Sequence, residues 1–328
     1  MTDRKLYVVG ANINVVDSAT NTVVDTYANE VSQANYAEGI SPNGRYIVSG
    51  GWDLPIGVWD TTTHSGVGQL AAPGGYHYSG VTFSADSTKA QVWAMGVGYA
   101  EIDLATCTLI TTWSPGSGDT AIPAAVAQTS DHTTAFFCIS AGNLSAIRLS
   151  DNSVLWTTGF SGVYWTGMSE DGTTLYVQSP GHVNGVDPAT GTVMWATNTS
   201  AWVEHSQSCG GVVPDANGGG CIVADFPGNG LVCVRQNGDL TGISLPSGAT
   251  YNFGNIACAN GNAYIFGFPT ADGYLVVVDL SSLTWTENIP ITDSWPVGGV
   301  FLGAPSGPPL GSWSTASQSN WSGQGPVV

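Results

Sequence analysis

The sequence predicts an all-β protein, a seven-bladed β-propeller with four antiparallel strands in each blade. Two observations lead to this prediction. A short apolar strand, a tight turn that usually begins with Asp, and a second strand recur along the chain, as in VNGVDPATGTVMWAT at 183–197. The position that begins the turn falls at 17, 60, 103, 148, 187, 236 and 279, with intervals of 43, 43, 45, 39, 49 and 43 residues. A period in the forties built only from strands and turns is typical of propellers.

Each repeat divides into four strands, which we name A to D from the propeller axis outward. In the second repeat these are expected at 37–41, 45–50, 56–60 and 66–71. The turns between strands A and B are rich in Asn, Asp and Gly. Asn and Asp hydrogen-bond their own backbone two residues on, and Gly supplies positive φ. We therefore interpret the carboxylates in these turns as turn formers rather than as ligands.

The chain begins out of phase with its own repeat. Residues 6–10, 13–17 and 22–27 read as strands B, C and D with no strand A before them. Residues 296–304 (PVGGVFLGA) read as a strand A with nothing after it. We expect the two ends to form a seventh blade together and to close the ring, because closure removes unpaired strand edges. The predicted domains are a propeller at 1–304 and a C-terminal arm at 305–328.

The charge balance excludes some classes of partner. The 328 residues include 24 acidic and 6 basic side chains, a net charge of −18, and only 9% are charged, against about 25% in average proteins. Nucleic-acid binding needs clustered Lys and Arg, so we expect no nucleic-acid partner. No apolar run approaches the roughly 20 residues of a membrane span, so we expect no membrane insertion.

The first residues pass from charged side chains directly into a strand, without the apolar segment of a secretory signal. We therefore expect a soluble product that leaves the cell by lysis or by a dedicated system. The six cysteines contain no CxxC pair and no metal-like spacing with the five histidines. We interpret them as small buried hydrophobes, with a disulfide in the sixth repeat as the alternative.

The repeats resemble two propeller families. INVVDSATNTVVDTY (13–27) and SPNGRYIVSGG (41–51) resemble the YVTN-type repeat, and VNGVDPATGTVMWAT and IRLSDNSVLWTTG (147–159) resemble the PQQ-like repeat. The resemblance covers about residues 5–303. It implies the propeller fold, and it implies that four Trp residues dock one blade on the next: Trp113, Trp156, Trp195 and Trp285.

Quinoprotein enzymes among the PQQ-like relatives need a cofactor stacked on an axial Trp, a calcium ion and usually two adjacent cysteines. This chain has no adjacent cysteines and no recognisable calcium motif. The resemblance therefore does not imply redox activity, and we expect no cofactor and no metal.

The D-to-A connections and the B–C loops share one face of a propeller, and here the connections are long and aromatic. We name the residues expected there the aromatic rim: Tyr36, Trp52, Tyr76, Tyr78, Tyr164, Trp165, Trp202, His205 and Trp295. Aromatic faces beside amides and hydroxyls suit a sugar or a protein partner. The alternative is that these side chains only pack neighbouring blades together.

Catalysis finds little support in the sequence. His77, Glu204, His205 and Asp293 are expected on the rim face, but no spacing forces a nucleophile against a base. Neither GxSxG nor HExxH occurs. We therefore predict no catalytic residue. His64 and His132 belong to turns that we expect on the opposite face.

The last residues, 306–328, are rich in Pro, Gly and Ser and read as an extended arm. Trp313 and Trp321 would serve as buried anchors on a partner, or the arm folds back onto its own blades. In overall style the chain resembles minor tail proteins of tailed bacteriophages.

The first functional hypothesis is a non-enzymatic virion tail component. It would be made in the host cytoplasm and would present a propeller face to the host envelope or to neighbouring tail proteins. Its partners would be other tail proteins and a host-surface glycan. The alternative is a secreted or surface-associated glycan-binding lectin, located outside the cell. A third hypothesis is a polysaccharide lyase or hydrolase.

Overall fold

The structure is a computed structural model. It describes residues 5–10, 12–29, 37–50, 55–71, 78–94, 98–114, 126–140, 142–201, 207–226, 230–244, 252–268, 274–291 and 300–302.

The N-terminal half of the described chain consists of strands joined by turns. Blade 1 contains β1 (Lys5–Val9), β2 (Asn12–Asp17) and β3 (Thr22–Ala28). Blade 2 contains β4 (Ala37–Ile40), β5 (Tyr46–Gly50), β6 (Ile56–Asp60) and β7 (Ser65–Leu70). Blade 3 contains β8 (Tyr78–Phe83), β9 (Lys89–Ala94), β10 (Gly98–Asp103) and β11 (Thr108–Trp113). Blade 4 contains β12 (Ala127–Gln128), β13 (Thr134–Ser140), β14 (Asn143–Arg148) and β15 (Ser153–Gly159).

The C-terminal half continues the pattern, with one short 3-10 turn at Asp215–Asn217. Blade 5 contains β16 (Trp165–Met168), β17 (Leu175–Ser179), β18 (His182–Val186) and β19 (Val193–Asn198). Blade 6 contains β20 (Gln207–Val212), β21 (Cys221–Phe226), β22 (Leu231–Val234) and β23 (Leu240–Gly242). Blade 7 contains β24 (Asn252–Ala259), β25 (Asn262–Phe268), β26 (Tyr274–Asp279) and β27 (Thr284–Pro290), and β28 (Val300–Leu302) comes last.

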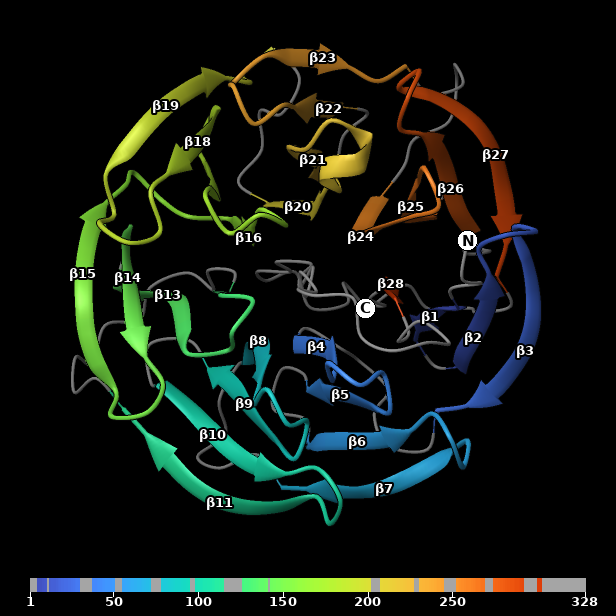
Figure 1. The fold of residues 1–328 in the computed structure, drawn as a ribbon. Helices are drawn as coiled ribbons and strands as arrows, with labels where there is room; N and C mark the ends of the chain where they lie inside the picture. The colour runs from blue at the N-terminus through green and yellow to red at the C-terminus, as the bar shows by residue number, and fades with distance from the viewer. Residues whose placement is uncertain are drawn as a thin grey trace, which may run out of the picture.

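The prediction of an all-β, seven-bladed propeller is confirmed. Seven antiparallel sheets lie around a central axis, with the first strand of each blade inside and the last at the circumference (Figure 1). Blade 1 takes three strands from the start of the chain, and β28 pairs antiparallel with β1 over three residue pairs, from Leu6↔Leu302 to Val8↔Val300. The strands of the second repeat begin and end within one residue of their predicted bounds.

A β-bulge recurs near the start of the outermost strand. In blade 4, Val154 faces Ile147 and Trp156 faces Ala146, so Leu155 is an extra residue between them. The same shift occurs in blades 1, 2, 3, 5 and 7. Because a bulge changes which side the following side chains point to, the residue just after it turns toward the next blade. We call this the docking position.

The outer turn of each blade, between strands C and D, carries one residue of positive φ. These residues are Asn21, His64, Cys107, Asn152, Gly191, Gly238 and Leu283, with φ between 51° and 89° throughout the set. Left-handed backbone is unfavourable for most L-residues. Four of these turns close with a backbone hydrogen bond to a carbonyl four residues earlier, and the turn of blade 6 closes one residue shorter, from Gly238 to Arg235.

Three of the four predicted Trp residues lie between blades, and two of them pack on the outer turn of the next blade. The Trp156 indole N–H donates to the Pro188 carbonyl at 2.9 Å in the outer turn of blade 5. Trp195 lies against Gly238 in the outer turn of blade 6. Trp113 instead packs on Trp93, with their ring centroids 6.3 Å apart, in a cluster shared with blade 4.

The prediction for Trp285 is wrong. Its side chain is 38% exposed, and its indole N–H donates to Asn288 in the same strand. Trp285 faces Val278 before the bulge, whereas Glu287 occupies the docking position. Glu287 accepts a hydrogen bond from Asn21 of blade 1 at 2.5 Å. The bulge therefore places Trp285 on the circumference.

The hydrophobic core lies between blades rather than at one centre, in clusters that each join two neighbouring sheets. Within the described chain, five cysteines are free and buried: Cys107, Cys138, Cys221, Cys233 and Cys258. The Cys209 side chain lies outside the described residues. No helix among the described residues is both long and apolar enough to cross a membrane.

Candidate functional site

Most of the predicted aromatic rim and both predicted anchors of the arm lie outside the described residues. They are Tyr36, Trp52, Tyr76, Trp202, His205, Trp295, Trp313 and Trp321. Tyr78 is the first residue of β8, and its side chain is outside the described part of the structure.

The two rim residues whose side chains are described are both buried. Tyr164 is 8% exposed, and burial raises the pKa of its phenol. Trp165 is 0% exposed and lies against Gly210 of blade 6, where an added Cβ would come within 2.5 Å of the indole. Trp165 belongs to a core cluster that joins blades 5 and 6. Both placements match the alternative of blade packing that the sequence left open.

The opposite face consists of the A–B turns and the outer turns. Each A–B turn from blade 2 to blade 5 is built on one acidic or amide side chain. In blade 3, Asp86 accepts hydrogen bonds from the Ser84 hydroxyl at 2.7 Å and from the backbone N–H of Thr88 at 3.1 Å. Bonds from Ser84 and Thr88 lower the pKa of Asp86. The interpretation of these residues as turn formers is confirmed here by geometry.

A cleft of about 750 Å³ opens on this turn face between blades 3 and 4. Its lining comes from the A–B turns of both blades, from β9 and β10, and from the end of β14. The lining residues are Ser84, Ala85, Asp86, Thr88, Lys89, Gln91, Glu101, His132, Thr133, Thr134, Arg148, Leu149 and Ser150. We call this the interblade cleft. Its volume falls in the range of about 300–1,000 Å³ that ligand pockets occupy.

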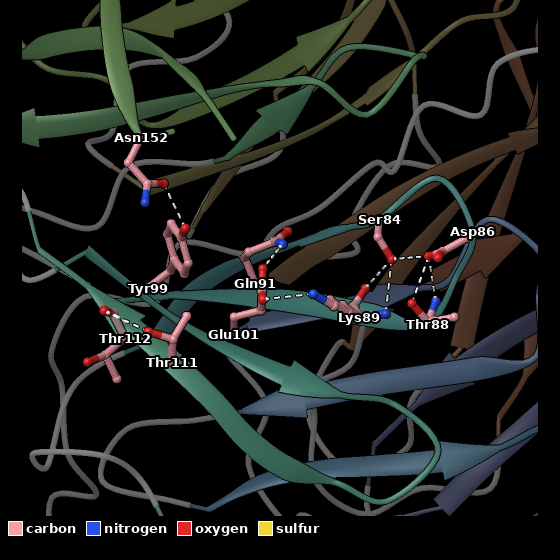
Figure 2. A network of polar contacts seen from close by, with 10 residues as sticks. All are labelled: Ser84, Asp86, Thr88, Lys89, Gln91, Tyr99, Glu101, Thr111, Thr112 and Asn152. Carbon is pink, nitrogen blue, oxygen red and sulfur yellow. Dashed lines mark hydrogen bonds and ion pairs between the residues drawn. The ribbon is translucent and has the colours of Figure 1, made fainter. Parts of the chain in front are cut away.

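A chain of hydrogen bonds organises the blade 3 wall (Figure 2). The Trp93 indole N–H donates to the Thr82 hydroxyl at 2.8 Å, which in turn donates to Gln91 at 3.0 Å. The Gln91 amide donates to one Glu101 oxygen at 2.8 Å, and the Lys89 ammonium lies 3.4 Å from the other. Thr82 and Gln91 are buried. The carboxylate at the cleft is therefore held from behind by a rigid buried network.

The blade 4 wall carries Arg148. Its Nη1 lies 3.3 Å from Asp151 and donates to Ser153 at 3.2 Å, and the side chain is 49% exposed. His132 also lines the cleft, and it lies on the turn face as expected from the sequence. Burial lowers the pKa of His132, which makes the neutral imidazole dominant at pH 7. The cleft thus has one half-exposed, ion-paired cation on each wall.

The sequence analysis missed Lys89, Arg148 and Glu101 as site residues. They are 12 or more residues apart in the chain, and no motif connects them. One signal was present: the chain has only six basic residues, and two of them line this cleft. Within the described chain, no three His, Cys, Asp or Glu side chains are arranged to hold a metal ion.

No protein-family model matches the chain, and no curated protein matches it. Solved structures do resemble it. Dihydro-heme d1 dehydrogenase NirN, in complex with DHE, aligns with a TM-score of 0.63 at 13% identity, covering 90% of this chain and 74% of that chain. The β-propeller domain of Cps50 (Swd1) from Myceliophteria thermophila aligns with a TM-score of 0.63 at 13% identity, covering 80% of this chain and 90% of that domain. At this identity the likeness concerns the fold alone.

Proposed function

We propose that this chain is a non-enzymatic binding protein that works through its propeller faces. The observation that carries the proposal is how the ionisable groups of the interblade cleft are used. Asp86 forms a turn, and Glu101 is held between Lys89 and Gln91. A general acid or base must release and regain a proton at the reacting atom. These carboxylates are instead engaged as hydrogen-bond acceptors, as in a surface that binds.

The more specific identity that we propose is a minor tail component of a tailed bacteriophage virion. Its support comes from the sequence: YVTN-type and PQQ-like repeats, a surface with few bases, an aromatic rim, and an arm with two Trp residues. The partners would be neighbouring tail proteins and a glycan of the host surface, with no nucleic acid and no membrane insertion.

Adsorption of the purified protein to host cells tests this proposal. Trp202→Ala with Trp295→Ala should reduce adsorption strongly, because Trp side chains dominate binding energies at interfaces. Trp285→Ala is the matched control, because Trp285 is an exposed Trp that is not among the residues assigned to the rim. Equal adsorption by the rim variant and the control would refute the role of the rim. Absence of the protein from purified virions would refute the virion identity.

A glycan-binding lectin outside the cell is the second candidate. A specific observation favours it: hydroxyl groups and two cations line one cleft of suitable volume. Genomic neighbourhood separates the candidates, with tail genes expected for the first and export or cell-wall genes for the second.

A further inference from the structure

We propose that the interblade cleft binds an acidic sugar, a pyranose that carries a carboxylate, such as a uronate. The inference deepens the proposed binding function and rests on it. The cations of the cleft have more N–H donors than the described residues have acceptors near them.

The cations of the cleft have unused hydrogen-bond donors. A Lys ammonium has three N–H groups and an Arg guanidinium has five. Glu101, at 3.4 Å, is the one acceptor near Lys89 among the described residues. The described partners of Arg148, Asp151 and Ser153, both meet Nη1. This leaves Nε and Nη2 of Arg148 without a described acceptor, although the side chain is only 49% exposed.

The two cations come from opposite walls, Lys89 from β9 and Arg148 from β14. A carboxylate is the ligand group that fits both, because it accepts the planar fork of Arg while a second cation meets its other lone pairs. The acids of the cleft do not cancel this attraction. One oxygen of Asp86 accepts hydrogen bonds from Ser84 and Thr88, and Glu101 accepts from Gln91 as well as lying beside Lys89.

The net charge of −18 acts against an anionic ligand mainly at long range. At physiological ionic strength, charges separated by more than a Debye length of about 8 Å are largely screened. The groups inside the cleft therefore decide the local preference, and two of the six basic residues of the chain are there.

The rest of the lining suits a sugar ring better than a bare inorganic anion. Thr133, Thr134 and Ser150 line the cleft together with the apolar residues Ala85 and Leu149. Sugars present the same combination of hydroxyl edges and C–H faces. A cleft of about 750 Å³ is also far larger than phosphate or sulfate requires.

Titration calorimetry with sodium glucuronate at physiological ionic strength tests the inference, with glucose as the neutral counterpart. We expect glucuronate to bind and glucose to bind at least about tenfold more weakly, which corresponds to the loss of one charge-assisted interaction. Lys89→Gln and Arg148→Gln should each weaken glucuronate binding by about tenfold. Arg45→Gln is the matched control, since Arg45 is also about half exposed and ion-paired on a turn, but of blade 2.

Glu101→Gln should strengthen binding, and a partly unfolded variant would not bind more tightly. It removes a negative charge that competes for Lys89, so glucuronate should bind more tightly than to the wild-type protein, by about threefold. Unchanged or weaker binding by this variant would count against the assigned geometry.

The inference is overturned if glucose binds as well as glucuronate, or if Lys89→Gln and Arg148→Gln bind as the wild type does. It is also overturned if inorganic phosphate or an acidic peptide displaces glucuronate at equal concentration, since the cleft would then be a general anion site. Failure of uronate binding with intact cell adsorption leaves the proposed function standing. Loss of adsorption by the rim variant with intact uronate binding separates the two sites.

Discussion

Two neighbouring interfaces of this propeller use the same outer turn in opposite ways. Between blades 4 and 5, Gly191 occupies the turn, and Trp156 covers it so closely that an added Cβ would come within 2.6 Å of the ring. Between blades 3 and 4, Asn152 occupies the equivalent position and accepts a hydrogen bond from the Tyr99 hydroxyl at 2.7 Å. The first interface is filled, and the second contains the interblade cleft.

The residue at the docking position differs between the two interfaces. The position holds Trp156 in blade 4 and Thr111 in blade 3. The indole of Trp156 packs against Gly191, where an added Cβ would collide with the ring, whereas the interface with Thr111 is joined at its outer turn by the Tyr99–Asn152 hydrogen bond. The side chain at the docking position is therefore one difference between the two interfaces.

Removal of the docking side chain should show the largest contrast. Trp156→Ala at the filled interface should lower the free energy of unfolding by about 4 kcal/mol, because it leaves a cavity and an unpaired Pro188 carbonyl. Tyr99→Phe at the interface between blades 3 and 4 removes one hydrogen bond and should cost about 1 kcal/mol. Urea denaturation of both variants measures the difference, and equal losses would mean that the two interfaces are energetically alike.

Substitution of the outer-turn residues tests the same contacts through the partners of Trp156 and Tyr99. Gly191→Asn should cost about 3 kcal/mol, since the new side chain collides with Trp156. Asn152→Gly loses the bond to Tyr99 but relieves a φ of 59°, so its net cost should be about 1 kcal/mol or less. If Gly191→Asn were tolerated in thermal unfolding, the close approach of Trp156 would not be what requires glycine.

The smallest expected effect is on the stability of the protein at low pH. Burial acts to raise the pKa of Asp171 in blade 5, but hydrogen bonds from Thr173, Ser169 and Gln236 outweigh it and hold the pKa at about 2. A lowered folded-state pKa stabilises the protein above the unfolded value of about 4. That stability is lost as the pH falls from about 4 to about 2.

Asp171 is bonded across an interface to Gln236 of blade 6, whereas the bonds of Asp86 stay in its own turn. Asp171→Asn should therefore reduce the acid-dependent loss of stability more than Asp86→Asn does. Urea midpoints between pH 2.5 and pH 6 measure this. A larger effect of Asp86→Asn would contradict the advantage assigned to bonds between blades.

Much of the fold was predictable because local chemistry repeats. The period of the turns indicated the number of blades, and Asp or Asn in the turns indicated where strands end. The sequence also contains the information that the prediction for Trp285 overlooked. Trp156 and Trp195 each follow the first turn residue by eight positions, but Trp285 follows Asp279 by six. That offset places it before the bulge, where side chains face solvent.

The interblade cleft could not be predicted from the sequence. Lys89 and Arg148 belong to different repeats, and no motif connects the two. Trp165 was equally ambiguous: its position predicted an aromatic side chain near the rim face, but only the packing of Gly210 against it decided that it is buried.

The sequence by itself determined the all-β class, the seven repeats and the chemistry of the turns, because each of these depends on residues within a few positions of one another. Tertiary structure decided how neighbouring blades pack and that the interblade cleft opens between blades 3 and 4. The contacts responsible join residues more than 30 positions apart, as between Trp156 and Pro188 or Tyr99 and Asn152. Whether two such side chains meet depends on the relative position of two sheets, and shape complementarity between sheets leaves no periodic trace in the chain.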